Sequence, residues 1–204
     1  MTPTARTGAA IVAVLAWAGL VVQFTASFDA TGSTGQTLWV LLRFFTILTN
    51  LLVAVLFSGI AFGNDAWASP RLVGGTMLAI LLVGIVYGLL LSNIPLPTAG
   101  GSQMANILLH KVTPVAVPLW WTAFARKGGT THRDPWLWAL YPLAYLPYAL
   151  ARGMSEGVYA YPFINLDRLG WGQVLANAAM IALGFLVAGH VVVAIDQRLS
   201  RRQR

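Results

Sequence analysis

The sequence predicts an all-α membrane protein, a bundle of six transmembrane helices that forms one domain over residues 1–204. Two features of the composition support this class. The chain is 57% hydrophobic and only 9% charged, whereas a typical soluble domain is about 25% charged. Its mean hydropathy is +0.70. The third observation is that the apolar residues are gathered in six runs, and polar segments separate these runs.

Each of the six runs is long enough, or nearly so, to cross a bilayer. A hydrocarbon core about 30 Å thick requires about 20 mostly apolar helical residues. We place the spans at 8–25, 37–62, 72–93, 104–125, 136–152 and 172–194. The segments between them, such as "DATGSTGQ" and "RKGGTTHRDP", concentrate Gly, Pro, Ser, Thr and charge, which is typical of loops. The first run exceeds the apolar region of a secretory signal, so we interpret it as the first span.

The distribution of basic residues predicts the topology. Cytoplasmic loops of membrane proteins collect Lys and Arg. With the N-terminus inside, the loops on that side hold nine of the thirteen basic residues, and the other side holds only Arg152 and Arg168. The nine are Arg6, Arg71, Arg126, Lys127, Arg133, Arg198, Arg201, Arg202 and Arg204. We therefore expect both termini in the cytoplasm and the second and fourth spans running inward from the outer face.

Several classes of function are excluded. The chain has no cysteine, which removes thiolate nucleophiles, disulfides and Cys-ligated metals. No His and carboxylate cluster has metal-ligand spacing, and there is no phosphate loop, "GxSxG" elbow or dinucleotide fingerprint. The basic residues form no patch of the kind that binds nucleic acid. We expect a cofactor-free protein without a metal, whose partners are the bilayer and a lipid substrate.

Three ionisable residues inside the predicted spans are candidates for a functional site: Arg43, His110 and Lys111. A fourth, His190, lies near the inner end of the last span, where we expect an interfacial or helix-packing role. Such a residue costs about 2.5 to 3.5 kcal/mol to insert and is by default a functional-site hypothesis. At 1.5 Å of rise per residue, Thr46 lies about 13 Å and His110 about 9 Å below the outer boundary. Arg43 would then lie one helical turn outward of Thr46. Polar faces of the second and fourth spans can thus meet at similar depth.

This pairing permits nucleophilic catalysis. A hydroxyl attacks an ester when a neighbouring base takes its proton, and neutral imidazole is the usual base. Thr46 supplies the hydroxyl and His110 the imidazole, while Asn50 or Asn106 can donate to the oxyanion or orient the ring. The alternative is structural, since a membrane threonine often bonds its own backbone or a neighbouring helix and a histidine can link two helices. Both interpretations remain open from the residues alone.

Three stretches of the sequence together resemble a known family. "RFFTILTNLL" (43–52), "NILLHKVTPVAVPLWW" (106–121) and "RGMSEGVYAYPFINLDRLGW" (152–171) occur in that order. In order and approximate spacing they resemble the androgen-induced protein family of multi-pass membrane proteins, in its bacterial six-span branch. The resemblance covers essentially the whole chain. It implies an integral protein of the bacterial inner membrane.

The resemblance also implies an activity and its residues. Animal members of the family are threonine hydrolases that split fatty acid esters of hydroxy fatty acids with one intramembrane Thr and one intramembrane His. The family's nucleophile falls on Thr46, which follows "RFF", and its histidine on His110, four residues after Asn106. The motif selects Thr46 over Thr49. The expected function is therefore hydrolysis of a long-chain lipid ester within the membrane.

The expected substrate carries a carboxylate, which suggests a binding site for it. Arg43 is the natural anchor, with Lys111 and Arg152 as alternatives; extension of Arg43 to the outer head groups is the competing interpretation. Tyr159 and Tyr161 in "YAYPF" can form an aromatic lid or belong to an interfacial belt. The rival function is a non-catalytic binder or transporter of a lipophilic molecule, and a purely structural membrane subunit is a third possibility.

Overall fold

A computed structural model describes residues 1–95 and 100–201 of the chain. The protein is 81% helical, and the described residues contain no strand. The predicted all-α class is therefore confirmed. Arg202 and Arg204, which entered the topology prediction, lie outside the described residues.

The helices follow one another with short connections. The first four are α1 (Pro3–Thr31), α2 (Thr34–Leu41), α3 (Phe45–Ala61) and α4 (Pro70–Val86), and a π-helical turn η1 (Tyr87–Leu91) extends α4. Three short elements then make one continuous segment, namely α5 (Gln103–Ile107), the π-helical η2 (Leu108–Val112) and α6 (Thr113–Phe124). The chain ends with α7 (Asp134–Glu156), the 3-10 turn η3 (Pro162–Ile164) and α8 (Leu166–Arg201).

Three described segments are long and apolar enough to cross a membrane, namely Pro3–Thr31, Pro70–Leu91 and Leu166–Arg201. The pair α2 and α3 qualifies as a fourth if it is counted as one broken span. Large apolar side chains also face outward, including Val14, Leu119 and Met180, each about two-thirds exposed. Soluble proteins rarely expose contiguous apolar surface of this extent. These features support an integral membrane protein.

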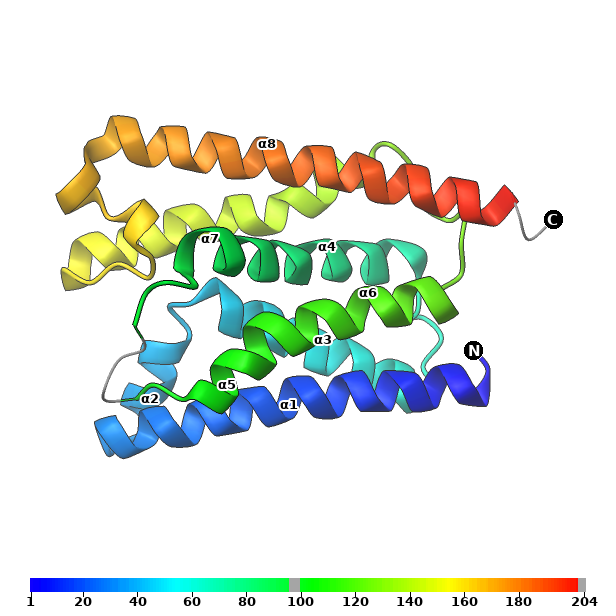
Figure 1. Ribbon diagram of the computed structural model, residues 1–204, viewed down its shortest axis with the longest axis horizontal. Helices are drawn as coiled ribbons and strands as arrows, with labels where there is room; N and C mark the ends of the chain where they lie inside the picture. The colour runs from blue at the N-terminus through cyan, green and yellow to red at the C-terminus, as the bar shows by residue number, and fades with distance from the viewer. Residues whose placement is uncertain (96–99, 202–204) are drawn as a thin grey trace.

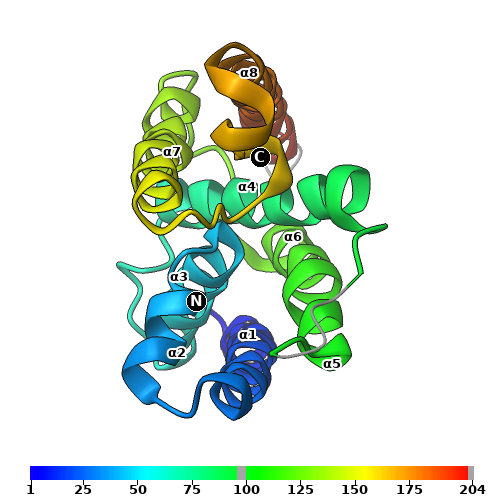
Figure 2. The ribbon, with the colours of Figure 1, turned by 90° about the vertical axis from the view of Figure 1, so that its left-hand side faces the viewer.

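The helices run roughly along one axis, and both chain ends lie at the same end of the bundle (Figure 1). A view along the axis shows α4 in the middle, with α7 and α8 on one side and α1, α3 and α6 on the other (Figure 2). The core beside α3 contains Phe57, whose ring meets that of Trp120 edge-on at 5.0 Å. Trp120 also donates a 2.9 Å hydrogen bond to the carbonyl of Ala5, which joins α6 to α1.

The expectation of one continuous helix over 37–62 is wrong. The chain breaks at 42–44, and α2 and α3 meet at an angle of 100°. No Pro or Gly marks this break. Phe44 is extended there, and the carbonyls that the break leaves unpaired accept hydrogen bonds from α7: Tyr148 Oη donates to Leu42 at 3.1 Å and Tyr145 Oη to Arg43 at 2.8 Å. A tertiary contact therefore replaces the lost helical bonds.

Candidate active site

Thr46 lies in the first turn of α3, directly after the break. The first N–H groups of a helix have no partner within it. The Thr46 N–H donates instead to the hydroxyl of Tyr161, at 3.3 Å. The Thr46 side chain is on the protein interior, since the residue is only 6% exposed. The break thus places a buried hydroxyl beside the positive end of a helix dipole.

His110 faces this hydroxyl. Its Nε2 lies 3.2 Å from Thr46 Oγ1, and its Nδ1 lies 3.2 Å from the carbonyl oxygen of Asn106. A carbonyl oxygen only accepts, so Nδ1 carries the proton and Nε2 has the free lone pair. Thr46 Oγ1 therefore donates its proton toward Nε2. The structure brings together the two residues that the sequence singled out, with the imidazole in the tautomer that a general base requires.

The imidazole is held by an aromatic neighbour that the sequence analysis missed. The ring of Tyr87 stacks on that of His110, with 4.5 Å between the centroids. The Asn106 side chain donates a 2.7 Å hydrogen bond to Tyr87 Oη. The approach of α4 that this stacking requires depends on Gly84, because a Cβ there would lie 2.8 Å from the Cβ of Pro114. Asn106 thus orients His110 through its backbone carbonyl and through Tyr87.

Asn50 has a different role from the one expected. It is fully buried, and its Nδ2 donates to the carbonyls of Thr46 at 2.9 Å and Leu109 at 3.2 Å. Leu109 needs this partner because the π-helical turn directs the Thr113 N–H to Leu108, and the next residue, Pro114, has no N–H. Both Nδ2 protons are therefore in use. In this arrangement no Nδ2 proton is directed toward an oxyanion, and Asn50 ties α3 to η2 behind the Thr46 and His110 pair.

Tyr161 reaches into the site from the connection between α7 and α8. Its hydroxyl lies 3.3 Å from the Thr46 N and 3.4 Å from Thr46 Oγ1. Because the N–H can only donate, the Tyr161 oxygen accepts it and keeps its own proton for Thr46 Oγ1 or for a substrate oxygen. Burial raises the pKa of the Tyr161 hydroxyl, so the group stays protonated. Tyr159, by contrast, donates to Asp167 at 3.4 Å and is outside the site.

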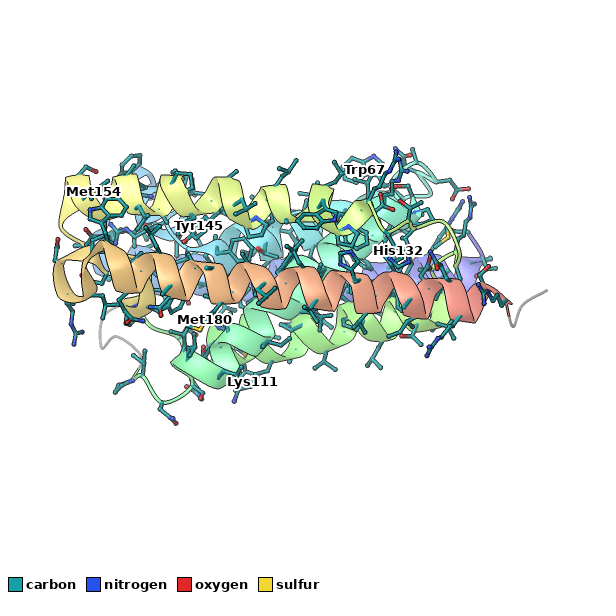
Figure 3. All side chains as sticks on the ribbon, turned by 90° about the horizontal axis from the view of Figure 1, so that it is seen from above. Trp67, Lys111, His132, Tyr145, Met154 and Met180 are labelled. Carbon is teal, nitrogen blue, oxygen red and sulfur yellow. The ribbon has the colours of Figure 1, made fainter. Side chains whose placement is uncertain are left out.

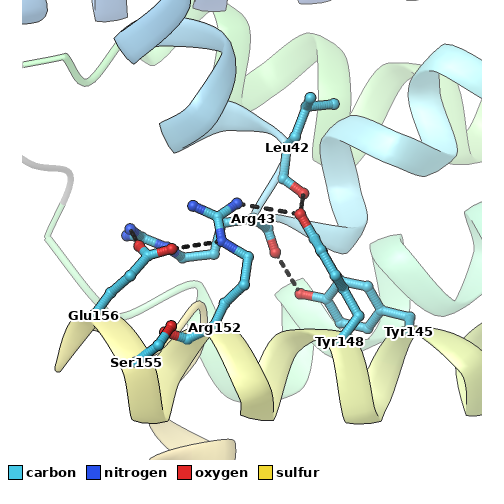
Figure 4. A network of polar contacts seen from close by, with 7 residues as sticks. All are labelled: Leu42, Arg43, Tyr145, Tyr148, Arg152, Ser155 and Glu156. Atoms are coloured by element: carbon cyan, nitrogen blue, oxygen red, sulfur yellow. Dashed lines mark hydrogen bonds and ion pairs between the residues drawn. The ribbon is translucent and has the colours of Figure 1, made fainter.

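The predicted carboxylate anchors are engaged elsewhere. Arg43 lies in the break rather than one turn above Thr46, and it forms an ion pair with Glu156 (Figure 4). Arg152 Nε binds the same carboxylate at 2.7 Å, and its guanidinium lies 4.1 Å from the centroid of the Trp39 ring. The hydrogen bond from Arg152 holds the pKa of the Glu156 carboxyl below its usual range. Both arginines are buried and clamp the end of α7 to the break.

The Lys111 side chain also points away from Thr46 and His110. Lys111 follows His110 in the π-helical turn, but its side chain is exposed and lies at the edge of the bundle (Figure 3). The expectations for Arg43, Lys111, Arg152 and Tyr159 as direct substrate ligands are therefore not supported by their positions. Of the predicted substrate-binding residues, Tyr161 alone lines the cavities beside Thr46 described below.

Two cavities meet at Thr46 and Tyr161. The first has a volume of about 110 Å³ and lies among α3, α4, α7 and α8. Its polar lining residues are Thr46, Tyr145 and Tyr161. The other walls are apolar, for example Leu82, Val86, Leu146, Ile181 and Phe185. The second, of about 480 Å³, lies beside His110 and includes more polar residues, for example Gln23, Ser27, Thr31, Tyr87 and Asn106. We call them the apolar cavity and the polar vestibule. The nucleophile candidate stands between them.

One signal for the missed residues was present in the sequence. Tyr141, Tyr145 and Tyr148 recur at a spacing of four and three, which places them on one face of a helix. All three bond the segment around the break: Tyr141 Oη lies 3.1 Å from Thr49 Oγ1, and the other two bond the carbonyls at 42 and 43. This tyrosine face of α7 positions Thr46 without touching it. Thr49 is buried and bonds this face instead of His110.

Comparisons with known proteins do not add to this geometry. No family model matches the chain, and searches of curated proteins and of solved structures found no match. Within residues 1–95 and 100–201, no group of three or more His, Cys, Asp or Glu side chains is placed to hold a metal ion. The function of the protein is therefore inferred from the geometry of the site.

Proposed function

We propose that this protein hydrolyses a long-chain lipid ester within the membrane, with Thr46 as nucleophile and His110 as general base. One observation carries the proposal: Thr46 Oγ1 lies 3.2 Å from the unprotonated nitrogen of a half-buried imidazole whose other nitrogen is bound to the Asn106 carbonyl. A hydroxyl within hydrogen-bond reach of an oriented base is the recurring signature of nucleophilic catalysis. The resemblance to the androgen-induced protein family points to the same two residues.

The reaction proceeds in two steps. Thr46 Oγ1 attacks the acyl carbon while its proton passes to His110 Nε2, and the alcohol leaves with that proton. An acyl-threonine remains. His110 then removes a proton from water, whose oxygen attacks the acyl carbon, and the fatty acid leaves as Thr46 recovers its proton. The Asn106 carbonyl, which accepts from Nδ1, stabilises the imidazolium formed in each step.

Two donors are available for the oxyanion of each tetrahedral intermediate. The Thr46 N–H is at the N-terminus of α3, where the helix dipole favours negative charge. It donates to Tyr161 Oη over a long 3.3 Å bond, and an oxyanion would replace that neutral hydroxyl as its acceptor. The Tyr161 hydroxyl is within 3.4 Å of the nucleophile oxygen. Donors that are already oriented toward developing charge lower the barrier more than mobile water does. We assign oxyanion stabilisation to this pair, in place of Asn50.

The surroundings of the pair suit a lipid. The walls of the apolar cavity suit the carbonyl end of an acyl chain, and the cavity shares Leu82, Val86 and Phe185 with a larger apolar groove between α4 and α8 that offers room for the rest of the chain. We propose six spans with both termini in the cytoplasm of a bacterial inner membrane. The shared position of the two chain ends in Figure 1 and the basic residues near them support this topology. The site would then lie toward the outer leaflet.

The test is release of fatty acid from a panel of long-chain esters by purified protein in detergent. Thr46→Val removes the hydroxyl at nearly constant shape and is expected to lower turnover on the order of 10³-fold or more. Thr49→Val is the matched control, because Thr49 is buried three residues later on the same helix and bonds Tyr141 instead of His110. His110→Gln is expected to behave like Thr46→Val.

The outcomes separate the candidate functions. Thr46-dependent release that survives Thr49→Val establishes the hydrolase. Retained binding of an ester by both Thr46→Val and wild type, with no release from either, contradicts the hydrolase and supports the binder or transporter. Folding of each variant is checked by its thermal transition in the same detergent.

A further inference from the structure

The polar vestibule contains hydrogen-bonding groups but no charged one. Among the described residues that line it, none is Lys, Arg, Asp or Glu. Its ionisable residues are His110, Tyr87 and Tyr161. The nearby arginines at 43 and 152 bind Glu156 and do not line it. Lys111 has its Nζ 5.9 Å from the centroid of the Tyr87 ring, but its side chain is exposed and does not line the vestibule. A carboxylate placed here would lose its hydration without gaining a cation, which is strongly unfavourable in a site of low dielectric.

The vestibule offers both free acceptors and free donors to a ligand. The donors include the second Nδ2 proton of Asn106 and the hydroxyl proton of Tyr87, for which the described residues provide no acceptor. Gln23 Nε2 donates to Ser27 Oγ at 3.0 Å and to the carbonyl of Gly100 at 2.8 Å. Asn106 Nδ2 donates to Tyr87. The side-chain oxygens of Gln23 and Asn106 make no hydrogen bond within the described part of the chain, so they remain to accept a proton from a ligand. A carboxylate can only accept and leaves these oxygens unpaired, whereas an alcohol hydroxyl can donate to them and also accept from the free donors.

The two cavities also assign the two halves of an ester. Both contact Thr46, so a carbonyl carbon at Thr46 Oγ1 has one substituent on each side. The acyl chain suits the apolar cavity, whose only polar groups besides Thr46 among the described residues are the hydroxyls of Tyr145 and Tyr161. The alcohol half then occupies the vestibule beside His110, which is the side from which Nε2 must protonate the leaving oxygen.

We propose that the substrate is an ester of a fatty acid with an uncharged alcohol that bears further hydroxyl groups, such as a monoacylglycerol. This inference rests on the proposed hydrolase function and narrows its substrate class. Water supplies the hydroxyl that ends on the acyl carbon and the hydrogen that ends on the glycerol oxygen, so the products are fatty acid and glycerol. An ester of a hydroxy fatty acid with a free carboxylate is disfavoured by the same vestibule.

The experiment compares esters that differ in one charge. Purified full-length protein in detergent micelles is given the palmitoyl ester of a hydroxystearic acid, either as the free acid or as its methyl ester, at equal mole fraction, with 1-monopalmitoylglycerol in parallel. Palmitate release is measured for wild type and for Thr46→Val. We expect wild type to split the methyl ester about tenfold faster than the free acid or more, and to split the monoacylglycerol at least as fast as the methyl ester.

A charge variant tests whether the vestibule is the cause. Gln23→Lys introduces a cation beside Ser27 and is expected to narrow the methyl ester preference several-fold, because an ammonium offsets the cost of a carboxylate. The control is Gln36→Lys, which adds the same charge at an exposed position of α2 that lines neither cavity nor the apolar groove, and it should leave the preference unchanged.

The two proposals fail in different ways. If the free acid is split as fast as the methyl ester or faster, with release abolished in Thr46→Val, the neutral-alcohol inference is overturned and the hydrolase stands. An unchanged preference in Gln23→Lys also counts against the inference. If no ester is split in a Thr46-dependent manner, the hydrolase proposal fails and the inference fails with it.

Discussion

Removal of the Tyr161 hydroxyl tests the assignment of the oxyanion donors. In Tyr161→Phe the ring keeps its stacking on Phe163, at 5.2 Å between centroids, and its edge contact with Phe44, at 6.0 Å. Only the hydroxyl is lost. The loop should therefore keep its position, and the effect should fall on catalysis rather than on folding.

The expected size follows from the contacts of that hydroxyl. Its bonds to Thr46, at 3.3 and 3.4 Å, are at the long end of the hydrogen-bond range, so the folded state should lose only about 1 kcal/mol. An oxyanion donor matters more in the transition state, where its loss lowers kcat on the order of 10² to 10³-fold, or about 2.7 to 4 kcal/mol. We expect a fall in kcat with little change in KM.

The assay is steady-state fatty acid release in detergent, with the thermal transition of each variant measured in the same buffer. Tyr159→Phe is the matched control, because Tyr159 is two residues away in the same loop but its hydroxyl bonds Asp167 and is exposed to solvent. A kcat for Tyr161→Phe equal to that of wild type would refute the assignment of Tyr161. An equal loss of kcat in both variants would show an effect of the loop as a whole.

Three further predictions concern the residues that support the site. Gly84→Ala should lower activity and cost about 1 to 3 kcal/mol through overpacking, since its Cβ would meet a proline of α6 at 2.8 Å, while Gly88→Ala, with open space around it, should do neither; comparison of kcat and thermal stability checks this. Asn50→Leu leaves the buried carbonyl of Leu109 unpaired and should cost about 1 to 3 kcal/mol, seen as a lower transition temperature in detergent; a transition equal to that of wild type would contradict the role given to this amide. Glu156→Gln should destabilise the protein at neutral pH, because two buried guanidinium groups lose their shared carboxylate. The pKa of this carboxyl is lowered in the folded state, so its contribution is present above the unfolded value near 4.5 and is lost as pH falls through the folded value; the wild-type transition temperature should decline over that range, and the variant should lack that part of the decline.

The sequence by itself determined the fold class and the candidate pair. A chain with 57% hydrophobic and 9% charged residues has little choice but helices in a bilayer, since every backbone group must be satisfied within its own segment there. Thr46 and His110 stood out because polar residues are costly in such segments, and their similar depth followed from helical rise alone. These inferences need only local periodicity and composition.

Tertiary structure decided where the remaining polar groups are directed. The break at 42–44 has no local cause in the sequence; it exists because tyrosines from α7, about 100 residues later, satisfy its carbonyls. For the same reason Arg43 binds Glu156, 113 residues away, instead of standing above Thr46. Helical spacing predicts which residues share a face, but it does not predict which distant partner a buried donor or acceptor will find. The proposed oxyanion donors and the uncharged vestibule follow from those distant partners.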